Sequence, residues 1–405
     1  MIKNRMNKIY IKNIFILLSI FTPIFFIPYE IYTDEISSTV TTASTNRFIP
    51  SNTLIRPIPI SFFFIIICCF FYLKTDLKIK NIKYFILIIF CFLINILFYD
   101  FEIKKVLYFI LFSVPFFSFI ISLKININFK IQEKFIIFFC LIISLISLYN
   151  LIINTNFQLK DKLFFFTIYQ NQQYFGPLLA ALCFYPLLVQ TVTKLNTIKI
   201  FFFIIYFLLT IANLLFYNSL SVILIIIVGI ILLLIKYHSS SKNFFYLIII
   251  VSSLIITLKK NEFTSKIISE ISVAKKIEII LQGEIPDNIL HRKEIYIKFY
   301  QNLNYQNLLI GNKNLNFINS YQSTHNYITE LIYFYGLLPA IIVIIFFFKL
   351  IKKVFKNKDN QYFYFAILFI FYLILENLTK VPMRQLYSGI ISFYIIATLL
   401  RKFKN

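Results

Sequence analysis

The chain is poor in charged residues, and this shortage excludes most soluble classes of protein. Only 14% of the 405 residues are charged, whereas 59% are hydrophobic, and the mean hydropathy is +0.80. A soluble fold of this length has too little interior to hide so much apolar surface. Lipid is therefore the solvent that the composition predicts for most of the chain.

The motifs of soluble enzymes are also missing. The sequence has no glycine-rich phosphate loop, no serine nucleophile elbow, no paired acidic motif and no Cys/His spacing typical of a metal site. All five cysteines lie inside apolar runs, so they predict neither a disulfide framework nor zinc ligands. Any chemistry must therefore depend on the sparse polar residues in or beside the membrane.

Acidic residues are scarce as well, with 17 against 40 basic ones, for a formal net charge of +23. In a soluble protein this excess would suggest nucleic acid as a partner. Here the basic residues lie in short gaps between apolar runs, which is typical of cytoplasmic membrane loops. We therefore expect membrane lipid, and no nucleic acid, as the partner of these charges.

What the chain does contain is a series of apolar runs long enough, or nearly so, to cross a bilayer. The candidate spans lie near 13–32, 57–73, 84–99, 106–123, 135–154, 172–192, 200–217, 221–235, 244–258, 326–348, 361–377 and 385–400. The first follows a basic N-terminus without a small-residue cleavage site, so we expect it to remain as a signal anchor. The predicted fold class is thus an all-α integral membrane protein of about twelve transmembrane helices.

Polar residues concentrate in one long segment, which divides the chain into three parts. Residues 1–258 hold spans 1–9, residues 259–325 form a large external loop, and residues 326–405 hold spans 10–12. We expect both termini in the cytoplasm. With this orientation, Lys and Arg are far more frequent in the cytoplasmic segments than in the short external loops. Because the chain has only six glycines, Gly283, Gly311 and Gly336 around the long loop indicate a constrained backbone there.

Two residues of the loop are candidate catalytic groups. His325, one of three histidines, ends the loop directly before span 10, where an imidazole is suited to general-base catalysis. The alternative is that His325 only caps the helix that Asn326 begins. Arg292 has the fork of donors that matches diphosphate oxygens, and the alternative is a solvated cation near Glu294.

A second set of polar residues are candidate substrate-binding groups. They are Arg47, Arg56, Arg384, Asn326, Glu330 and Asn171. The three arginines are external and are not explained by the charge bias of the loops. Acidic residues in a span usually face a cavity or a partner, which applies to Glu330 and to Glu376, although Glu376 can also form a simple ion pair with Arg384. Asn171 lies in an amide-rich stretch, which either forms hydrogen bonds with a sugar or is only a solvated loop.

The polar residues around the long loop resemble the signature of a known family. The matching positions are Arg292–Tyr296, Leu309–Asn312, Phe317, His325–Tyr327, Leu331 and Gly336–Leu337 before a long apolar span. This pattern resembles the O-antigen ligase/polymerase family of multi-span, GT-C-like membrane glycosyltransferases. In that family a loop arginine and a loop-end histidine match Arg292 and His325. One departure is Ser219-Leu220, where many members have a Ser-Arg pair.

The resemblance implies a function in the assembly of surface polysaccharide, including lipopolysaccharide. The implied donor is an undecaprenyl-diphosphate-linked glycan, used without a metal or other cofactor, and the acceptor is a glycan or lipid A-core. We expect a repeat-unit polymerase of the bacterial inner membrane, with a chain-length regulator and a flippase as partners. The alternatives are an O-antigen ligase, a protein O-oligosaccharyltransferase and, from another class, a polysaccharide flippase or other transporter.

Overall fold

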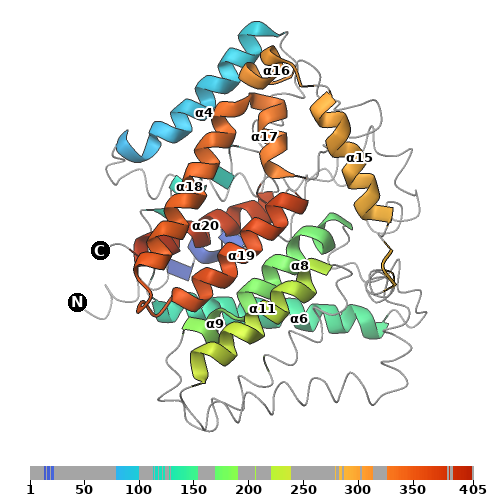
Figure 1. Ribbon diagram of the computed structural model, residues 1–405. Helices are drawn as coiled ribbons and strands as arrows, with labels where there is room; N and C mark the ends of the chain where they lie inside the picture. The colour runs from blue at the N-terminus through green and yellow to red at the C-terminus, as the bar shows by residue number, and fades with distance from the viewer. Residues whose placement is uncertain are drawn as a thin grey trace. The chain divides into compact units, whose positions relative to one another are not determined.

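The computed structural model describes the chain in several stretches (Figure 1). The described residues are 79–99, 129–153, 169–189, 220–238, 287–301, 303–312, 326–380 and 386–403, with shorter pieces within 13–21, 113–127 and 279–284 and the single residues Tyr206 and Met383. The predicted spans 57–73 and 244–258, and most of 13–32, 106–123 and 200–217, lie outside them.

The described elements are α-helices, and no strand occurs among these residues. The helices are α4 (Ile79–Phe98), α6 (Phe129–Ile153), α8 (Tyr169–Cys183), α9 (Tyr185–Val189), α11 (Leu220–Tyr237), α15 (Asp287–Gln301), α16 (Tyr305–Ile310), α17 (Tyr327–Tyr335), α18 (Leu337–Lys356), α19 (Phe363–Thr379) and α20 (Leu386–Lys402). The all-α part of the predicted fold class is therefore confirmed for this part of the chain.

One described helix, Leu220–Tyr237, is long and apolar enough to cross a membrane. Shorter apolar helices occur at Ile86–Phe98, Gly176–Val189 and Phe363–Thr379. These features indicate a membrane protein by length and composition, and the number of twelve spans stays a prediction.

The apolar run 326–348, predicted as one span, is two helices in the structure. α17 ends at Gly336, whose φ of 85° lies in the left-handed region and whose backbone N–H donates to the carbonyl of Ile332. α18 then starts at Leu337, packs along α17 and continues to Lys356. The prediction of a single helix was wrong because hydropathy does not register a backbone reversal at one glycine.

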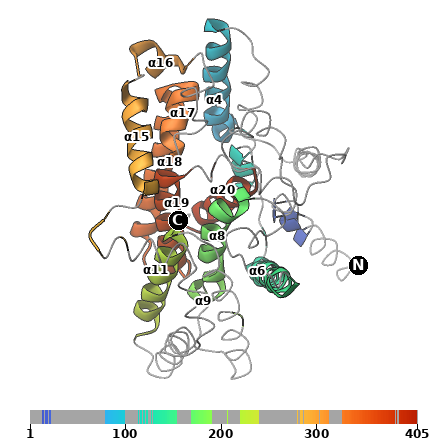
Figure 2. The ribbon, with the colours of Figure 1, turned by 90° about the vertical axis from the view of Figure 1, so that its right-hand side faces the viewer.

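The described helices fall into two compact units. The first contains Asp287–Lys356 and Leu373–Asn405 together with the N-terminal segment Met1–Asn128. In it, α18 contacts α4, α16, α17 and α20, and α16 lies against α4 and α17 (Figures 1 and 2). Four phenylalanines, Phe116, Phe119, Phe346 and Phe393, pack with ring centroids 5.3–6.0 Å apart in its core.

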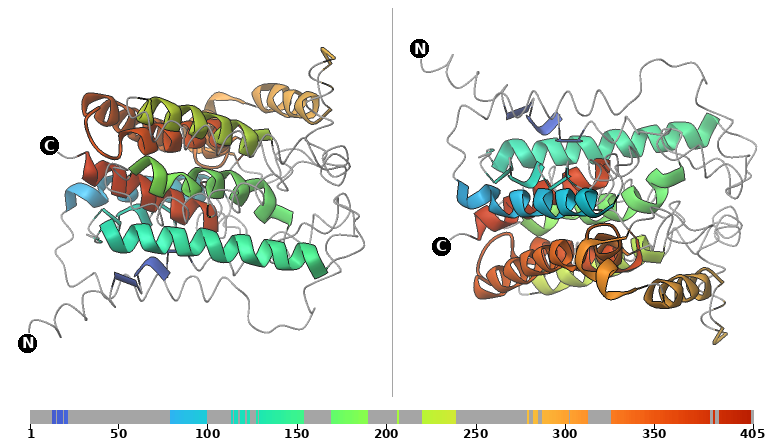
Figure 3. Two further views of the ribbon diagram at one scale, coloured as in Figure 1. Left: turned by 90° about the horizontal axis from the view of Figure 1, so that it is seen from below. Right: turned by 90° about the horizontal axis from the view of Figure 1, so that it is seen from above.

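The second unit contains Phe129–Pro286 and Asn357–Tyr372. Here α8 lies between α6 and α11, as the view from below shows (Figure 3, left). Gly229 makes the close approach of α11 possible, because a Cβ there would come within 2.6 Å of the Phe184 ring. At the end of α9, Lys236 donates to the carbonyls of Leu187 and Leu188 at 3.1 and 2.8 Å, a favourable position for a cation.

The ends of α16 and α17 meet backbone to backbone at two glycines of the first unit. The N–H of Asn312 donates to the carbonyl of Tyr333 at 2.7 Å. A Cβ at Gly311 would collide with the backbone of Phe334, and a Cβ at Gly336 would collide with the carbonyl of Leu309. Both glycines also have positive φ, 84° and 85°, so the predicted backbone constraint at these positions is confirmed.

Alanine at Gly311 or Gly336 is therefore expected to destabilise the first unit. Left-handed backbone costs a residue with a Cβ roughly 1–2 kcal/mol, and forced overpacking adds about 1–3 kcal/mol. Gly283→Ala is the matched control, because Gly283 has a φ of 82° but nothing within 4 Å of its Cβ position. Thermal unfolding in detergent should show a much larger fall in apparent Tm for G311A and G336A than for G283A. Equal falls for all three variants would contradict the backbone contact.

Candidate functional site

The candidate site of the first unit forms where α15, the start of α17 and the end of α19 converge. The hydroxyl of Tyr296 on α15 donates to the carbonyl oxygen of Leu378 at 3.0 Å. The side-chain amide of Asn326, directly before α17, donates to the same oxygen at 3.3 Å. Leu378 lies in the last turn of α19, whose carbonyls have no donor within the helix. Two segments 82 and 52 residues away in sequence thus meet on one helix end.

Arg292 lies one helical turn before Tyr296 on α15, where it is half-buried. Burial raises the pKa of the Tyr296 phenol, while its hydrogen bond with Asn326 and the positive charge of Arg292 act in the opposite direction. The carboxylate of Glu330 raises the same pKa. The phenol therefore stays protonated at neutral pH, and a cation and a carboxylate both act on it.

Asn326 is the residue that caps α17. Its Oδ1 accepts hydrogen bonds from the backbone N–H groups of Ile328 at 2.9 Å and Thr329 at 3.2 Å. These are two of the N–H groups that a helix start leaves without a partner. The residue that caps α17 is thus Asn326. The cap, which was the alternative role for His325, is provided by its neighbour. Contact of Asn326 with a substrate stays a prediction.

Glu330 lies in the first turn of α17 and is fully buried. Its backbone N–H donates to the carbonyl of Asn326 at 3.0 Å, as expected for a regular first turn. A carboxylate there interacts favourably with the N-terminal end of the helix dipole. Arg292, Asn326 and Glu330, all proposed from the sequence, are therefore brought together around Tyr296.

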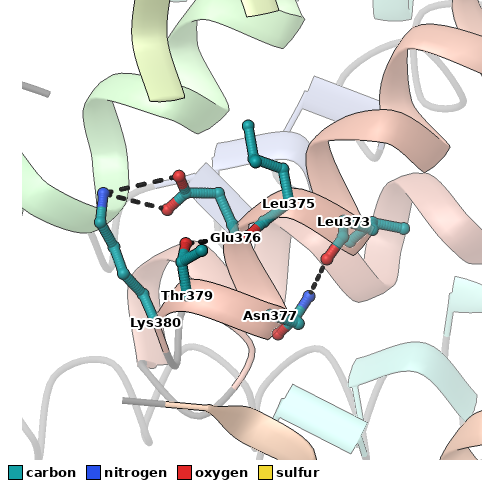
Figure 4. Close-up of polar contacts among 6 residues, drawn as sticks. All are labelled: Leu373, Leu375, Glu376, Asn377, Thr379 and Lys380. Atoms are coloured by element: carbon teal, nitrogen blue, oxygen red, sulfur yellow. Dashed lines mark hydrogen bonds and ion pairs between the residues drawn. The ribbon is translucent and has the colours of Figure 1, made fainter. Parts of the chain in front are cut away.

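A buried ion pair lies in the last turn of α19, two residues on either side of Leu378 (Figure 4). The Nζ of Lys380 is 3.3 Å from Oε2 and 3.5 Å from Oε1 of Glu376, and these side chains are 8% and 0% exposed. Next to the pair, the amide of Asn377 donates to the carbonyl of Leu373 at 2.7 Å. The partner found for Glu376 is thus Lys380, whereas the proposed partner Arg384 lies outside the described residues.

The other residues proposed from the sequence either lie outside the described residues or belong to the second unit. His325, Arg47 and Arg56 lie outside the described residues, as Arg384 does. Asn171 lies in the first turn of α8, in the second unit.

Sequence reasoning missed Tyr296 and Lys380. The available signal was spacing, because each lies four residues after a proposed residue, Arg292 or Glu376, and shares its helix face.

The cluster combines two cations, Arg292 and Lys380, and two acids, Glu330 and Glu376, around the phenol of Tyr296. Arg292 supplies a guanidinium with several donors, Tyr296 a protonated phenol, and Lys380 an ammonium neutralised by Glu376. Among the described residues, no group of three His, Cys, Asp or Glu side chains is placed to hold a metal ion.

Comparison with known proteins adds no assignment to this picture. No protein-family model matches the chain, and no curated protein matches it. The class that the described structure defines is an all-α protein with apolar helices, one of them long enough to cross a membrane.

Removing Lys380 alone should be strongly destabilising, because it leaves the Glu376 carboxylate buried without its counter-charge. Breaking a buried pair from one side costs about 3–5 kcal/mol, whereas replacing both partners is often close to neutral. Lys380→Met should therefore lower the apparent Tm in detergent, and Glu376→Gln combined with Lys380→Met should recover much of the loss. The exposed Lys358 provides the control, since Lys358→Met should change stability little. A double variant as unstable as the single one would rule out the pair as the cause.

Proposed function

We propose that the chain is a membrane glycosyltransferase that transfers an undecaprenyl-diphosphate-linked oligosaccharide to an acceptor sugar hydroxyl. The transfer takes place at the external face of the bacterial inner membrane, and the acceptor is another repeat unit, which makes the protein a surface-polysaccharide polymerase. The observation that supports this most is the convergence of Tyr296 and Asn326 on the carbonyl of Leu378. It holds the Arg292 helix beside the residue that directly follows His325.

The proposed reaction breaks the bond between the donor sugar carbon and the diphosphate oxygen. The acceptor hydroxyl oxygen forms a new bond to that carbon, and His325 takes the hydroxyl proton as general base. Undecaprenyl diphosphate leaves with the electron pair of the broken bond. Arg292 binds the diphosphate oxygens through two parallel N–H donors and stabilises the charge that develops on them.

Lys380 is the second cation that we assign to the donor diphosphate. The hairpin at Ser219-Leu220 lacks the arginine that resembling sequences carry, so another cation must take this task. Lys380 lies two residues after Leu378, and its ammonium is held by Glu376 at 3.3 Å.

Exposed apolar stripes support a chain that crosses the bilayer several times. On α11 the exposed residues are Leu224, Ile227, Ile231 and Ile235, and on α18 they include Ile341, Ile345 and Phe348. Both sets recur every three or four residues, so each forms one face of its helix. Large apolar faces of this kind suit lipid and not water.

Basic residues at helix ends support the proposed orientation. Lys or Arg occupies the last turn of α11, α18 and α20. By the positive-inside rule these three ends are cytoplasmic, which agrees with a cytoplasmic C-terminus. The start of α18 and the end of α19 are then external, on the side where the lipid-linked donor is used.

A transporter is the proposal from another class, and it predicts substrate and ion sites near the middle of the bilayer. Transfer of the glycan to an acceptor hydroxyl, which a transporter does not catalyse, separates the two proposals. A ligase or a protein O-oligosaccharyltransferase would use the same donor chemistry, and the acceptor used in the transfer assay separates them from a polymerase.

Substitution of Arg292 tests the proposed donor site. Arg292→Ala should abolish transfer from purified lipid-diphosphate donor in proteoliposomes, and Arg292→Lys should retain partial activity at best, since a point charge lacks the bidentate fork. Lys293→Ala is the matched control, because Lys293 is the exposed neighbour on the same helix. Wild-type transfer by Arg292→Ala, at equal protein in the membrane, would refute the role of Arg292.

Substitution of His325 tests the proposed base. His325→Ala should lower the transfer rate roughly 10²–10⁴-fold, the contribution typical of general-base catalysis. Because Asn326 already caps α17, His325→Asn and His325→Ser should stay equally slow although both are good helix caps. His238→Ala, at the far end of α11, should leave the rate unchanged. Full activity of the Asn or Ser variant would show that His325 is not the base.

A further inference from the structure

Large apolar side chains with high exposure gather on two neighbouring elements of the first unit. Leu97 and Phe98 at the end of α4 are 83% and 65% exposed, and Tyr305 and Leu309 on α16 are 89% and 70% exposed. We call these four residues the α4–α16 patch. α16 belongs to the segment 259–325 that the sequence predicts as an external loop, so water would be its expected environment.

The two elements of the α4–α16 patch are held together by polar contacts. The side-chain amide of Asn95 on α4 donates to the carbonyl of Ile310 at the end of α16, at 2.6 Å. The hydroxyl of Tyr99, directly after α4, donates to Oδ1 of Asn307 at 3.5 Å. Figures 1 and 2 both show α16 beside the C-terminal end of α4. The exposed apolar residues of α16 therefore extend the surface of α4.

The surface that is extended is an apolar stripe along α4. Its exposed residues Ile86, Phe90, Leu93 and Leu97 recur every three or four positions, while Ile88 and Phe92 on the same helix are buried. No charged residue occurs from Tyr84 to Tyr99. The part of α4 without charge, from Tyr84 to its last residue Phe98, is about 22 Å long and covers much of the hydrocarbon layer. A helix that is apolar both on its buried and on its exposed face has lipid as its natural solvent.

The composition of α16 suits the boundary between lipid and water. Its six residues, Tyr305–Ile310, include no charge and combine exposed apolar side chains with the amides of Gln306 and Asn307. Tyrosine is enriched at membrane interfaces, where its ring is in the apolar layer and its hydroxyl is hydrated. A short helix of this kind in water would leave Leu309 and the Tyr305 ring exposed without compensation.

We propose that α16 lies in the interfacial layer of the external leaflet and continues the lipid contact of α4. The occupant of the α4–α16 patch is the phospholipid bilayer, because the patch is continuous with the exposed apolar stripe of α4. The external segment is then anchored to the membrane surface at α16, next to the Gly311–Gly336 contact that ends α17. This inference rests on the membrane part of the proposed function and not on its chemistry.

The natural absence of tryptophan makes this inference directly testable. Tyr305→Trp and Leu309→Trp each introduce a single fluorophore into the patch. Ile227→Trp on the exposed stripe of α11 is the lipid control, and Asp359→Trp in the exposed connection between α18 and α19 is the aqueous control. Each variant is reconstituted into phosphatidylcholine vesicles with and without bromine on the acyl chains.

We expect the tryptophan emission of Y305W and L309W to shift to shorter wavelength and to be quenched by lipids brominated near the headgroup. I227W should be quenched by bromine deeper in the chain, and D359W should be quenched by iodide only. Iodide quenching of Y305W and L309W without bromine quenching would overturn the inference. So would a shift that depends on the protein-to-lipid ratio without bromine quenching, because it would indicate a second copy of the chain on the patch.

The controls separate this inference from the proposed function. Absence of bromine quenching in I227W would contradict the membrane class itself. Bromine quenching of I227W but not of Y305W and L309W would refute only the interfacial position of α16. Bromine quenching of all three variants, in a protein without transfer activity, would support the interfacial position of α16 and contradict the proposed glycosyltransferase activity.

Discussion

The backbone contact between the ends of α16 and α17 is the constraint on which the first unit depends. Two glycines with positive φ, Gly311 and Gly336, approach the opposite backbone so closely that no Cβ fits at either position. This contact ends α17 and turns the chain into α18. α17 has nine residues and is thus about 13 Å long. Because the helix is short and rigid, a contact that fixes its C-terminal end also determines the position of its N-terminal end. Asn326 is in this way held where it meets the end of α19.

The charges of the candidate site are few, and each has a defined counterpart or neighbour. Lys380 is neutralised by Glu376, while Arg292 and Glu330 both act on the half-buried phenol of Tyr296. In a poorly solvated place such charges interact more strongly than in water, and they are costly when unpaired. The proposed donor would bring negative charge to a site where the cations are already ordered, so little reorganisation is needed on binding.

Sequence patterns predicted the elements that hydropathy controls. The runs 221–235 and 385–400 correspond to α11 and α20, because both are apolar stretches that end at basic residues. The run 326–348 was predicted wrongly, since a uniform apolar composition hides the left-handed backbone of Gly336. Within the site, Tyr296 and Lys380 were missed because their roles depend on tertiary contacts, with Leu378 and with a buried Glu376. Likewise only the folded geometry shows that Asn326 is the cap of α17.

The carbonyl of Leu378 accepts from both Tyr296 and Asn326, and this sharing has an evolutionary consequence. A carbonyl oxygen has two lone pairs, and one donor is enough to avoid the penalty of an unsatisfied polar group. Loss of either donor therefore leaves the end of α19 attached to the other. Tyr296 can thus be exchanged while the contact is kept, whereas Asn326 is retained by its second task as the cap of α17.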